Sequence, residues 1–431
     1  MEIKRDHYLN QLIKKKQNGL AKIITGIRRC GKSYLLFNLY KQYLLADGVS
    51  EENIIEVPLD DLKNIKYRNP LELDSFIRSR ITNDKIYYVF IDEIQLVSSI
   101  INPYLNNPNV KIGFVDVVLG LMHIKNVDIY ITGSNSKMLS SDILTEFRGR
   151  GDELRVFPLS YSEFYHAYHD QVNAWQEYFT YGGMPQLLTM SEHSEKSNYL
   201  KYLFSNTYII DVIERNSIRT DSSYLDDLLN IISSSVGSLT NPQKISNTFS
   251  SKNKVNISPV TIANYLDYFC DAFIIDKVNR YDIKGRKYIG SPLKYYFTDI
   301  GLRNARLNFR QQEENHIMEN IIYNELVLRG FSVDVGVVEY FYKNAENKTT
   351  RSNFEVDFIA NKISKRYYIQ SALTVSNEEK RQQEINSLLR INDSFKKIVV
   401  VKENSIPWHD EQGILYLGIE RFLLDKNAID L

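Results

Sequence analysis

Residues 21–33, AKIITGIRRCGKS, decide the fold of the first part of this chain. The stretch KIIT (22–25) is rich in β-branched residues and predicts a short strand, whereas YLLFNLY (34–40) has the apolar spacing of a helix. Between them lies GIRRCGKS (26–33), a Gly-x-x-x-x-Gly-Lys-Ser sequence. A chance match in a glycine-containing turn would not need these flanks. The strand before and the helix after therefore indicate a phosphate-binding P-loop.

Each residue type in this loop suits a polyphosphate. Gly26 and Gly31 allow a tight turn in which backbone N–H groups point inward, and a helix starting near Lys32 adds its positive end. Lys32 is expected to reach the β- and γ-phosphates, and the Ser33 hydroxyl to take one Mg²⁺ position. The predicted cofactors are therefore ATP and Mg²⁺. The predicted nucleotide-binding residues are Gly26, Ile27, Arg28, Arg29, Cys30, Gly31, Lys32, Ser33 and Tyr34.

A second motif follows an unbroken apolar run, IYYVFI (86–91), which ends in Asp92-Glu93. Such a run is typical of a strand buried on both faces of a parallel sheet. By itself the acidic pair would be a solvated turn after a buried strand. After a P-loop it indicates a Walker B motif, in which Asp92 joins Ser33 in holding Mg²⁺ and Glu93 is the base that polarises the attacking water.

Two further segments are candidates for catalytic roles. The predicted strand VDIYIT (127–132) ends in Gly133-Ser134-Asn135-Ser136, and a polar side chain there would face the γ-phosphate. Ser134 or Asn135 is therefore a candidate sensor, although small polar residues also end strands for turn reasons alone. In TEFRGR (145–150), Arg148 and Arg150 form either a solvated loop or an arginine finger that reaches a neighbouring subunit's γ-phosphate.

Composition sets the remaining bounds. A chain of 431 residues is too long for one ordinary core, so two or three domains are expected. Lys+Arg and Asp+Glu both number 53, so the net charge gives no sign of a polyanionic partner. The two cysteines cannot make a disulfide framework or a zinc site. With no signal peptide and no apolar run near ~18 residues, we expect a cytoplasmic protein without a membrane partner.

Several motifs together resemble a bacterial and archaeal family of AAA+-type P-loop ATPases. In that family a conserved C-terminal domain of uncertain function, with a restriction-endonuclease-like core, follows the ATPase domain. The resemblance implies that Asn135 is the sensor, that Arg148 or Arg150 is the finger, and that the protein forms a homo-oligomer. The motifs are GIRRCGKSYLL (26–36), IDEIQ (91–95), TGSNS (132–136), GR (149–150), PLSYSEF (158–164) and YGGMP (181–185).

The middle of the chain predicts a winged helix. Helical patterns cover 225–236 and begin at 241 and 258, and a turn at DIKGR (282–286) predicts a hairpin. In such a fold the third helix enters a major groove, and basic residues of the hairpin contact phosphates. The alternatives are a solvated basic face or a winged helix that serves as a protein spacer. The candidate contacts to double-stranded DNA are Thr261, Asn264, Lys284, Arg286 and Lys287.

The last part predicts a helix at 316–329, strands at 332–338, 340–343, 354–360 and 366–372, a helix at 378–390 and a last strand at 397–401. This order resembles the nuclease-like core of the family. By that resemblance Glu319 and Asp357 match two metal-binding carboxylates. Gln370 stands where a third carboxylate is expected and Ala372 where a lysine is expected. Because one metal-binding carboxylate and the lysine are missing, we expect this degenerate site not to cleave DNA.

The predicted fold class is α/β: an AAA+-like P-loop NTPase with a parallel sheet and helices on both faces, then a winged helix and a restriction-endonuclease-like domain. The expected domains are 1–165 (ATPase core), 166–223 (helical lid or connector), 224–306 (winged helix) and 307–431 (nuclease-like). The predicted function is Mg²⁺-dependent ATP hydrolysis to ADP, coupled to DNA or to a protein partner. The alternatives are a slow nucleotide-dependent switch that binds proteins, and an ATP-regulated metal-dependent nuclease.

Overall fold

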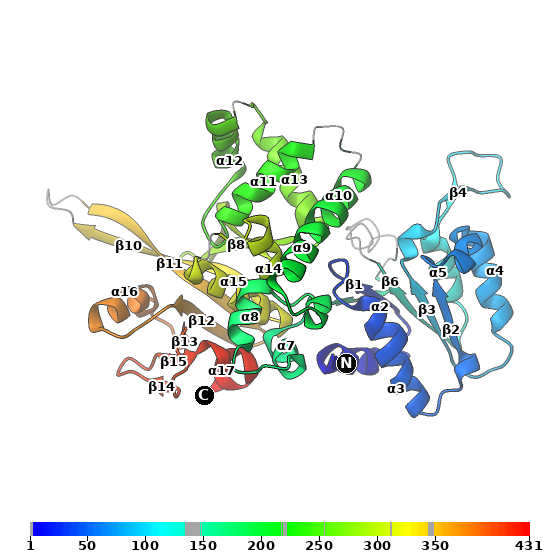
Figure 1. Ribbon diagram of the computed structural model, residues 1–431, viewed down its shortest axis with the longest axis horizontal. Coiled ribbons are helices and arrows are strands. Elements are labelled where there is room, and N and C mark those ends of the chain that lie inside the picture. Colours follow the sequence, from blue (N-terminus) through cyan, green and yellow to red (C-terminus); the bar gives the residue numbers. More distant parts are fainter. Residues whose placement is uncertain are drawn as a thin grey trace. The chain divides into compact units, whose positions relative to one another are not determined.

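The computed structural model describes residues 3–133, 147, 149–216, 218, 222–253, 255–310, 313–343 and 349–431 (Figure 1). The chain divides into two compact units. The first comprises Met1–Pro158 and Asp271–Phe273, and the second Leu159–Cys270 and Ile274–Leu431. The predicted sensor residues Ser134 and Asn135 and the candidate finger Arg148 lie outside the described residues. The four predicted domain ranges remain predictions.

The first unit is built on a five-stranded sheet in the order β2-β3-β6-β1-β7, and every pair of neighbours is parallel. The predicted α/β fold with a parallel sheet is therefore confirmed for this unit. The strands are β1 (Ala21–Thr25), β2 (Ile54–Pro58), β3 (Tyr87–Asp92), β6 (Val127–Thr132) and β7 (Gly151–Arg155). The helices are α1 (Asp6–Lys15), α2 (Lys32–Tyr34), η1 (Leu35–Tyr40), α3 (Lys41–Ala46), α4 (Pro70–Arg80) and α5 (Phe114–Leu121).

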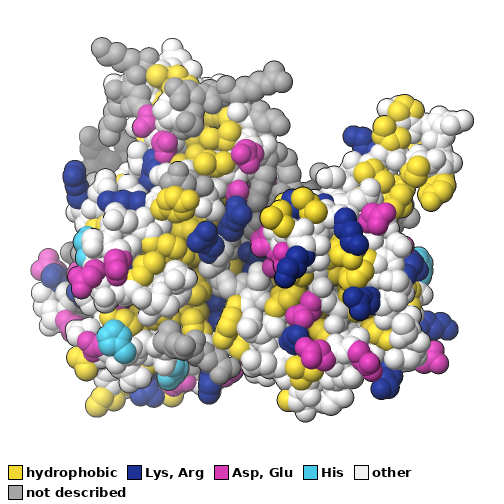
Figure 2. Space-filling view, turned by 45° about the vertical axis from the view of Figure 1, so that its right-hand side comes forward, with side chains coloured by type: hydrophobic (Ala, Val, Ile, Leu, Met, Phe, Trp, Pro, Cys, Tyr) yellow, Lys and Arg dark blue, Asp and Glu magenta, His cyan; other side chains and the backbone are white. Residues whose placement is uncertain are grey.

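A small hairpin of β4 (Ile100–Ile101) and β5 (Lys111–Ile112) projects from this unit between Walker B and α5. Figure 2 shows hydrophobic side chains on the projecting segment. Tyr104 is 81% exposed, and Ile101 and Leu105 are each more than half exposed. The hairpin therefore presents apolar side chains that the unit itself does not cover.

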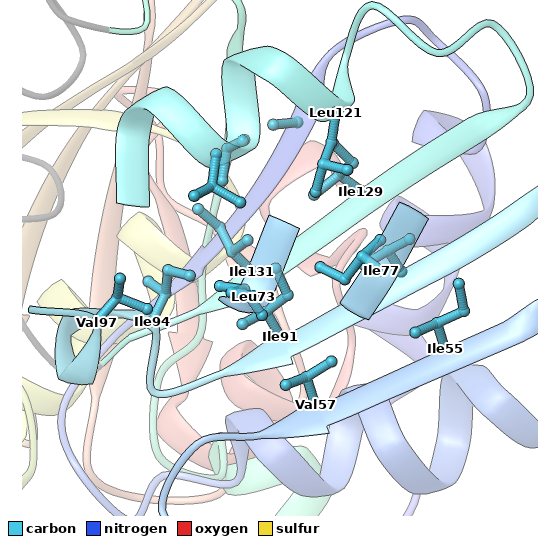
Figure 3. Close-up of a cluster of buried hydrophobic side chains, with 14 of the residues drawn as sticks. Ile55, Val57, Leu73, Ile77, Ile91, Ile94, Val97, Leu121, Ile129 and Ile131 are labelled. Carbon is cyan, nitrogen blue, oxygen red and sulfur yellow. The ribbon is translucent and has the colours of Figure 1, made fainter. Parts of the chain in front are cut away.

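The core of the first unit lies on one face of the sheet (Figure 3). Ile91 of β3 and Ile131 of β6 pack there with Leu73 of α4 and Leu121 of α5, because side chains two residues apart on a strand share a face. The opposite face carries Phe90, Tyr130 and Tyr88, and Tyr40 of η1 packs on it. Helices thus cover both faces, as expected for buried parallel strands.

A buried ion pair lies on that second face. Lys22 of β1 is fully buried and forms a hydrogen-bonded pair with Asp128 of β6. The Tyr130 hydroxyl donates to Asp128 at 2.7 Å, and the backbone N–H of Gln17 donates to the same carboxylate at 2.9 Å. Burial lowers the pKa of Lys22, and the charge of Asp128 opposes that shift. The pair joins two central strands beneath the helix that follows the P-loop.

The first helices of the second unit explain the motifs PLSYSEF (158–164) and YGGMP (181–185). Ser160 and Glu163 form a capping box at the start of α7 (Tyr161–Ala167). Asp299 caps α14 (Ile300–Arg306) by accepting from Leu302 N at 3.0 Å, and its other oxygen accepts from Gly183 N at 2.7 Å. The other helices are α8 (Ala174–Tyr181), α9 (His193–Leu203), α10 (Ile209–Arg215), α11 (Ser222–Ser234), α12 (Pro242–Thr248) and α13 (Pro259–Asp271).

An eight-stranded mixed sheet forms the rest of the second unit, in the order β14-β15-β13-β12-β11-β10-β8-β9 (Figure 1). Helices α15 (Glu314–Leu328), α16 (Glu378–Leu389) and α17 (Ile419–Leu424) accompany it. Its strands are β8 (Ile275–Asp282), β9 (Lys287–Phe297), β10 (Ser332–Lys343), β11 (Thr349–Lys362), β12 (Lys365–Ala372), β13 (Lys396–Val401), β14 (Trp408–His409) and β15 (Leu415–Gly418).

The structure differs from the sequence prediction at three places in this sheet. Residues 332–338 and 340–343 form one strand, β10, because its pairing with β11 continues through Glu339. The strand at 397–401 is not the last, since β15 pairs parallel to β13. The three helices and the hairpin expected for a winged helix are present, but β8 also pairs parallel to β10, so the hairpin continues the C-terminal sheet. None of the described helices is long and apolar enough to cross a membrane.

Candidate functional site

The P-loop follows β1 at the carboxyl edge of the parallel sheet. Its backbone has positive φ at Gly26 (+133°), Arg29 (+66°) and Gly31 (+99°). A Cβ atom at position 26 would lie 2.0 Å from the carbonyl oxygen of Val156, just after β7. Glycine is therefore required at position 26 both by its backbone conformation and by the close approach of a neighbouring chain segment.

Contacts outside the motif fix the loop. The guanidinium of Arg5, which is 3% exposed, donates to the carbonyl oxygens of Cys30 at 3.0 Å and Phe157 at 2.7 Å. The Cys30 thiol donates to Val156 O at 3.3 Å. Arg5 was not predicted from the sequence, because its partners lie 25 and 152 positions away along the chain. Cys30 acts here as a small buried residue of the loop.

Lys32 and Ser33 differ in exposure. Lys32 is 5% exposed, and its ammonium group donates to the carbonyl oxygens of Gly26 at 2.9 Å and Ile27 at 3.0 Å. It therefore lies inside the curve of the loop, at the start of α2. Ser33 is exposed, as are Arg28 and Arg29, while Tyr34 is half-buried.

The Walker B residues end β3 at the same edge. Asp92 is 6% exposed and accepts a hydrogen bond from the hydroxyl of Thr132, the last residue of β6. The same hydroxyl oxygen accepts from the backbone N–H of Glu93 at 3.3 Å. Glu93 has a left-handed backbone (φ +52°), which is strained for a residue with a side chain and is often found at functional sites. Its carboxylate accepts from the Gln95 side chain.

Strand order explains why these groups meet. Strands β3, β6 and β1 are neighbours and run parallel, so their carboxyl ends lie along one edge. The register pairs Ile24 of β1 with Thr132 of β6, next to the start of the P-loop. The predicted residues Lys32, Ser33, Asp92 and Glu93 thus share an edge with Thr132. Thr132 was missed in the sequence, although it ends the predicted strand beside Walker B.

Arg150 lies at the other edge of the sheet. It is exposed, and its carbonyl oxygen accepts from Ala21 N at 2.9 Å, at the amino end of β1. The four steps from Ala21 to Thr25, at a rise of about 3.3 Å per residue, separate that end from the start of the P-loop by about 13 Å. Arg150 is therefore not brought together with the other predicted catalytic residues of its own chain.

The predicted nuclease-like residues come from three elements of the second unit. Glu319 of α15 is 6% exposed and Asp357 of β11 is 8% exposed. Gln370 of β12 accepts from Asp357 N at 3.3 Å, and Ser371 N donates to the Asp357 carboxylate at 2.8 Å. Burial, followed by the charge of Glu319, raises the pKa of Asp357 well above its ordinary value.

Lys294 lies among these groups, although it was not predicted from the sequence to be part of this site. Lys294 of β9 is 2% exposed and donates to Glu319 at 2.7 Å. Burial by itself would raise the pKa of Glu319, but the Lys294 ammonium and the hydrogen bonds of His316 and Tyr296 hold it below its ordinary value. Conversely, burial would lower the pKa of Lys294, but Glu319, Asp357 and other nearby carboxylates raise it overall.

The predicted DNA contacts do not form one surface of uniform charge. Of the two candidates on α13, Asn264 is exposed, whereas Thr261 is half-buried and its hydroxyl bonds to that of Ser258, the N-cap of the helix, at 2.8 Å. The sequence of α13, PVTIANYLDYFCD, holds two aspartates and no lysine or arginine. Such a helix is poorly suited to phosphate contacts. Two other basic residues of the same part of the chain, Lys294 and Arg303, are buried and serve internal contacts.

Two of the basic residues predicted at the hairpin turn line a cavity of the second unit together with other basic side chains. Lys287 is exposed on β9. Lys284 and Arg286 line a cavity of about 630 Å³ together with Lys365 and Arg366 at the start of β12. The lining also contains one carboxylate, Asp393, and the aromatic rings of Tyr281 and Phe395. The Arg366 guanidinium lies 5.8 Å from the centre of the Tyr281 ring and 5.3 Å from the centre of the Phe395 ring.

Comparison with known proteins defines the class of this site. Residues 18–165 match a family model described as an AAA domain, so the first unit contains an AAA-type nucleotide-binding domain with a P-loop. Residues 172–313 match a domain of unknown function, DUF8612.

Two relatives extend over most of the chain. An uncharacterized protein of Haemophilus influenzae is 33% identical over 406 residues, which cover 92% of this chain and 93% of the relative. An uncharacterized protein of Methanocaldococcus jannaschii is 28% identical over 355 residues, covering 78% of this chain and 71% of the relative. This chain belongs to the same family as the Haemophilus protein.

Among solved structures, the Walker-type ATPase paby2304 of Pyrococcus abyssi is similar with a TM-score of 0.47 and 14% identity, covering 71% of this chain and 96% of that one. The Orc1 protein of Aeropyrum pernix, solved in complex with DNA, has a TM-score of 0.32 and 11% identity, covering 72% and 93%. Both likenesses are too weak to support conclusions about this chain.

Proposed function

We propose that this protein is an ATPase that binds ATP with Mg²⁺ at the P-loop and hydrolyses it to ADP and phosphate. One observation carries the proposal: Lys32, Ser33, Asp92 and Glu93 share the carboxyl edge of one parallel sheet, where the Thr132 hydroxyl links Asp92 to the backbone of Glu93. Phosphate recognition, metal coordination and water activation require these four residue types at one place.

The oxygen atoms present suit Mg²⁺. The exposed Ser33 hydroxyl and the Asp92 carboxylate are hard oxygen donors, which this ion prefers. Thr132 takes up one oxygen of Asp92 and thereby fixes the orientation of the carboxylate. When bound, the ion would supply charge neutralisation at the β- and γ-phosphates.

The other roles belong to the chain itself. Lys32, whose ammonium now binds Gly26 O and Ile27 O, would exchange these carbonyl partners for phosphate oxygens. Glu93 would orient water and accept its proton, and its left-handed backbone sets the direction in which the carboxylate leaves the strand. Asn135 remains the proposed sensor. The position of Arg150 at the far edge of the sheet supports a finger role only in a neighbouring subunit, and Arg148 is the alternative.

The test is steady-state ATP hydrolysis with Mg²⁺, measured against protein concentration. Lys32→Ala is expected to lose ATP binding, whereas Glu93→Gln should bind ATP and lose turnover by about 10²-fold or more. Glu52→Gln, which removes an exposed carboxylate outside the site, is the matched control and should behave as wild type. Specific activity that rises with concentration would support a finger supplied by a second subunit. Wild-type turnover no faster than that of Glu93→Gln would refute hydrolysis and leave the nucleotide-switch alternative.

The basic cavity favours a second proposed function, contact with DNA by the second unit. Four cationic side chains and one carboxylate line it together with aromatic rings, and one of the four, Lys365, also pairs with Asp430 at 2.9 Å. Phosphate contacts of this kind make affinity fall steeply with salt.

The DNA proposal is tested by measuring the affinity for duplex DNA between 50 and 200 mM salt, with and without ATP. The double variant Lys284→Ala and Arg286→Ala should lower the salt slope by about 2, whereas Lys380→Ala on α16 should leave it unchanged. Salt-independent affinity, or no binding, would instead favour a protein partner.

A further inference from the structure

The ammonium group of Lys294 lies at the centre of a cluster of carboxylates. It is 2.7 Å from a carboxylate oxygen of Glu319 on α15 and 2.7 Å from one of Glu355 on β11. Asp357 lies two residues from Glu355 on the same strand, and its charge acts to raise the pKa of the lysine. Tyr296, two residues along β9 from the lysine, donates its hydroxyl to the same oxygen of Glu319 at 2.5 Å. The cluster therefore holds one positive group among three acidic side chains.

The surrounding backbone fixes the cluster. Asn320, next to Glu319, accepts from Phe297 N and donates to Phe297 O, both at 2.8 Å, which clamps α15 onto the end of β9. His316 approaches the second oxygen of Glu319 at 3.7 Å from the preceding turn of α15. A Cβ atom on Gly237 would lie 3.0 Å from that same oxygen, so the chain after α11 packs closely against the cluster. Lys294 and Glu319 cannot separate without breaking these contacts.

The acidic groups are of the kind that bind a hard divalent cation. Carboxylate oxygens and the side-chain oxygen of Gln370, which lies against Asp357, are suitable ligands for Mg²⁺ or Mn²⁺. An ammonium group is also a compact cation, and its three N–H donors can bind several carboxylate oxygens at once. Lys294 already makes two such contacts within hydrogen-bonding distance. Among the described residues, no group of three or more His, Cys, Asp or Glu side chains is arranged, as it stands, to hold a metal ion.

We propose that the Lys294 ammonium permanently takes the place of a divalent cation in this cluster, and that removing it creates a cation site held by Glu319, Glu355 and Asp357. The residues do not fit the metal that the nuclease-like resemblance implies, because a lysine from β9 stands where the ion would be. The Glu355 side chain is 33% exposed, so an ion can enter from solvent once the lysine is gone. Removing the lysine would leave Glu319 and Glu355 without their counter-ion, and because an uncompensated charge in a buried place is costly, this favours a replacement cation.

The test is Mn²⁺ titration followed by electron paramagnetic resonance on the full chain, without nucleotide. Wild type and Asp357→Asn should bind the same amount of Mn²⁺. Lys294→Met should bind one more ion per chain, at least tenfold more tightly than any site in wild type, and the added Asp357→Asn change should abolish that ion. Lys380→Met, which removes an exposed lysine from α16 in the same unit, is the control and should match wild type.

Thermal unfolding gives a second readout, because an ion bound to the folded state raises the Tm by mass action. Mn²⁺ should raise the Tm of Lys294→Met and leave that of wild type unchanged. Where Lys294→Met is too unstable to purify, Lys294→Gln keeps much of the volume without the charge. The proposal is overturned if wild type holds an ion that Asp357→Asn removes, or if both folded Lys294 variants gain none.

A corollary concerns DNA cleavage. With the cation position filled by Lys294, the wild-type chain should not nick plasmid DNA in Mg²⁺ or Mn²⁺. Nicking by wild type that is lost in Asp357→Ala would also overturn the proposal, whereas nicking that persists in that variant is contamination and leaves the expected result intact.

Discussion

Thr132 provides a sharp test of how the Walker B carboxylate is held. Its side chain is fully buried, and its hydroxyl donates to Asp92 and accepts from the backbone N–H of Glu93 at 3.3 Å. Valine has nearly the same shape but no hydroxyl. Thr132→Val therefore leaves a carboxylate oxygen and a backbone N–H without this partner, while packing changes little.

The size of the effect follows from these two bonds. A hydrogen bond to a charged group contributes about 1.5–3 kcal/mol, and the longer bond from the half-buried Glu93 contributes less. The extra methyl group of valine offsets up to about 1 kcal/mol by apolar burial. We therefore expect the free energy of unfolding to fall by about 1–3 kcal/mol. If the proposed hydrolysis occurs, kcat should also fall by about 10²-fold, because Asp92 loses its fixed orientation.

Urea unfolding and steady-state ATP hydrolysis measure these two effects. Thr132→Ser keeps the hydroxyl and removes only a methyl group, so it should retain most of the activity. A Thr132→Val protein within 0.5 kcal/mol of wild type, with unchanged kcat, would refute the claim that this hydroxyl orients Asp92. Equal loss in both variants would show that packing, and not the hydrogen bond, is responsible.

Three further predictions concern single sites. Gly26→Ala should abolish nucleotide binding, because the added Cβ would clash with a carbonyl oxygen. The control is Gly48→Ala, at a residue that also has positive φ but lies in open space. It should lower the free energy of unfolding in urea by about 1 kcal/mol and bind nucleotide normally. Lys22→Met should lower stability by about 3–5 kcal/mol by leaving a buried carboxylate unpaired, whereas Lys15→Met breaks a partly exposed pair and should cost less than about 1 kcal/mol. Burial raises the pKa of Asp299 from 3.8 to about 6. The contribution of Asp299 protonation to the free energy of unfolding is therefore fully present below pH 3.8 and is lost as the pH rises through about 6. The free energy of unfolding of wild type minus that of Asp299→Asn should fall by about 3 kcal/mol over that range.

The N-terminal fold could be predicted because its signals are local. The P-loop, the apolar strand before Asp92 and the strand that ends at Thr132 each occupy a short segment with a clear period. Parallel strands then bring their ends to one edge. For this reason the sequence predicted a common site for Lys32 and Asp92 without any knowledge of the contacts between them.

The missed residues act through partners far away in the sequence. Arg5 contacts the P-loop and the segment after β7, and nothing in its own neighbourhood signals that role. Lys294 offered one clue, since it lies within PLKYYF (292–297), and a lysine in an otherwise apolar strand end requires a buried partner. That partner, Glu319, lies on a helix 25 residues later, so its identity depends on how α15 packs.

The end of the chain was predicted less well because its strands are short. β14 has two residues and β15 four, which is too few for an alternating pattern to be recognised. Their place in the sheet comes from pairing with β13 and with each other.

The parallel pairing of β8 with β10 limits how this protein can be divided into fragments. It joins Arg280–Asp282 to Val335–Val337, and Ile283 N adds a bond to Val337 O at 3.0 Å. A fragment that ends at 306 would expose the edge of β8, and one that begins at 307 would expose the edge of β10. Unpaired edges of this kind invite aggregation. The cut would also leave Glu319 without its lysine, so fragments for expression should keep residues 274–431 together.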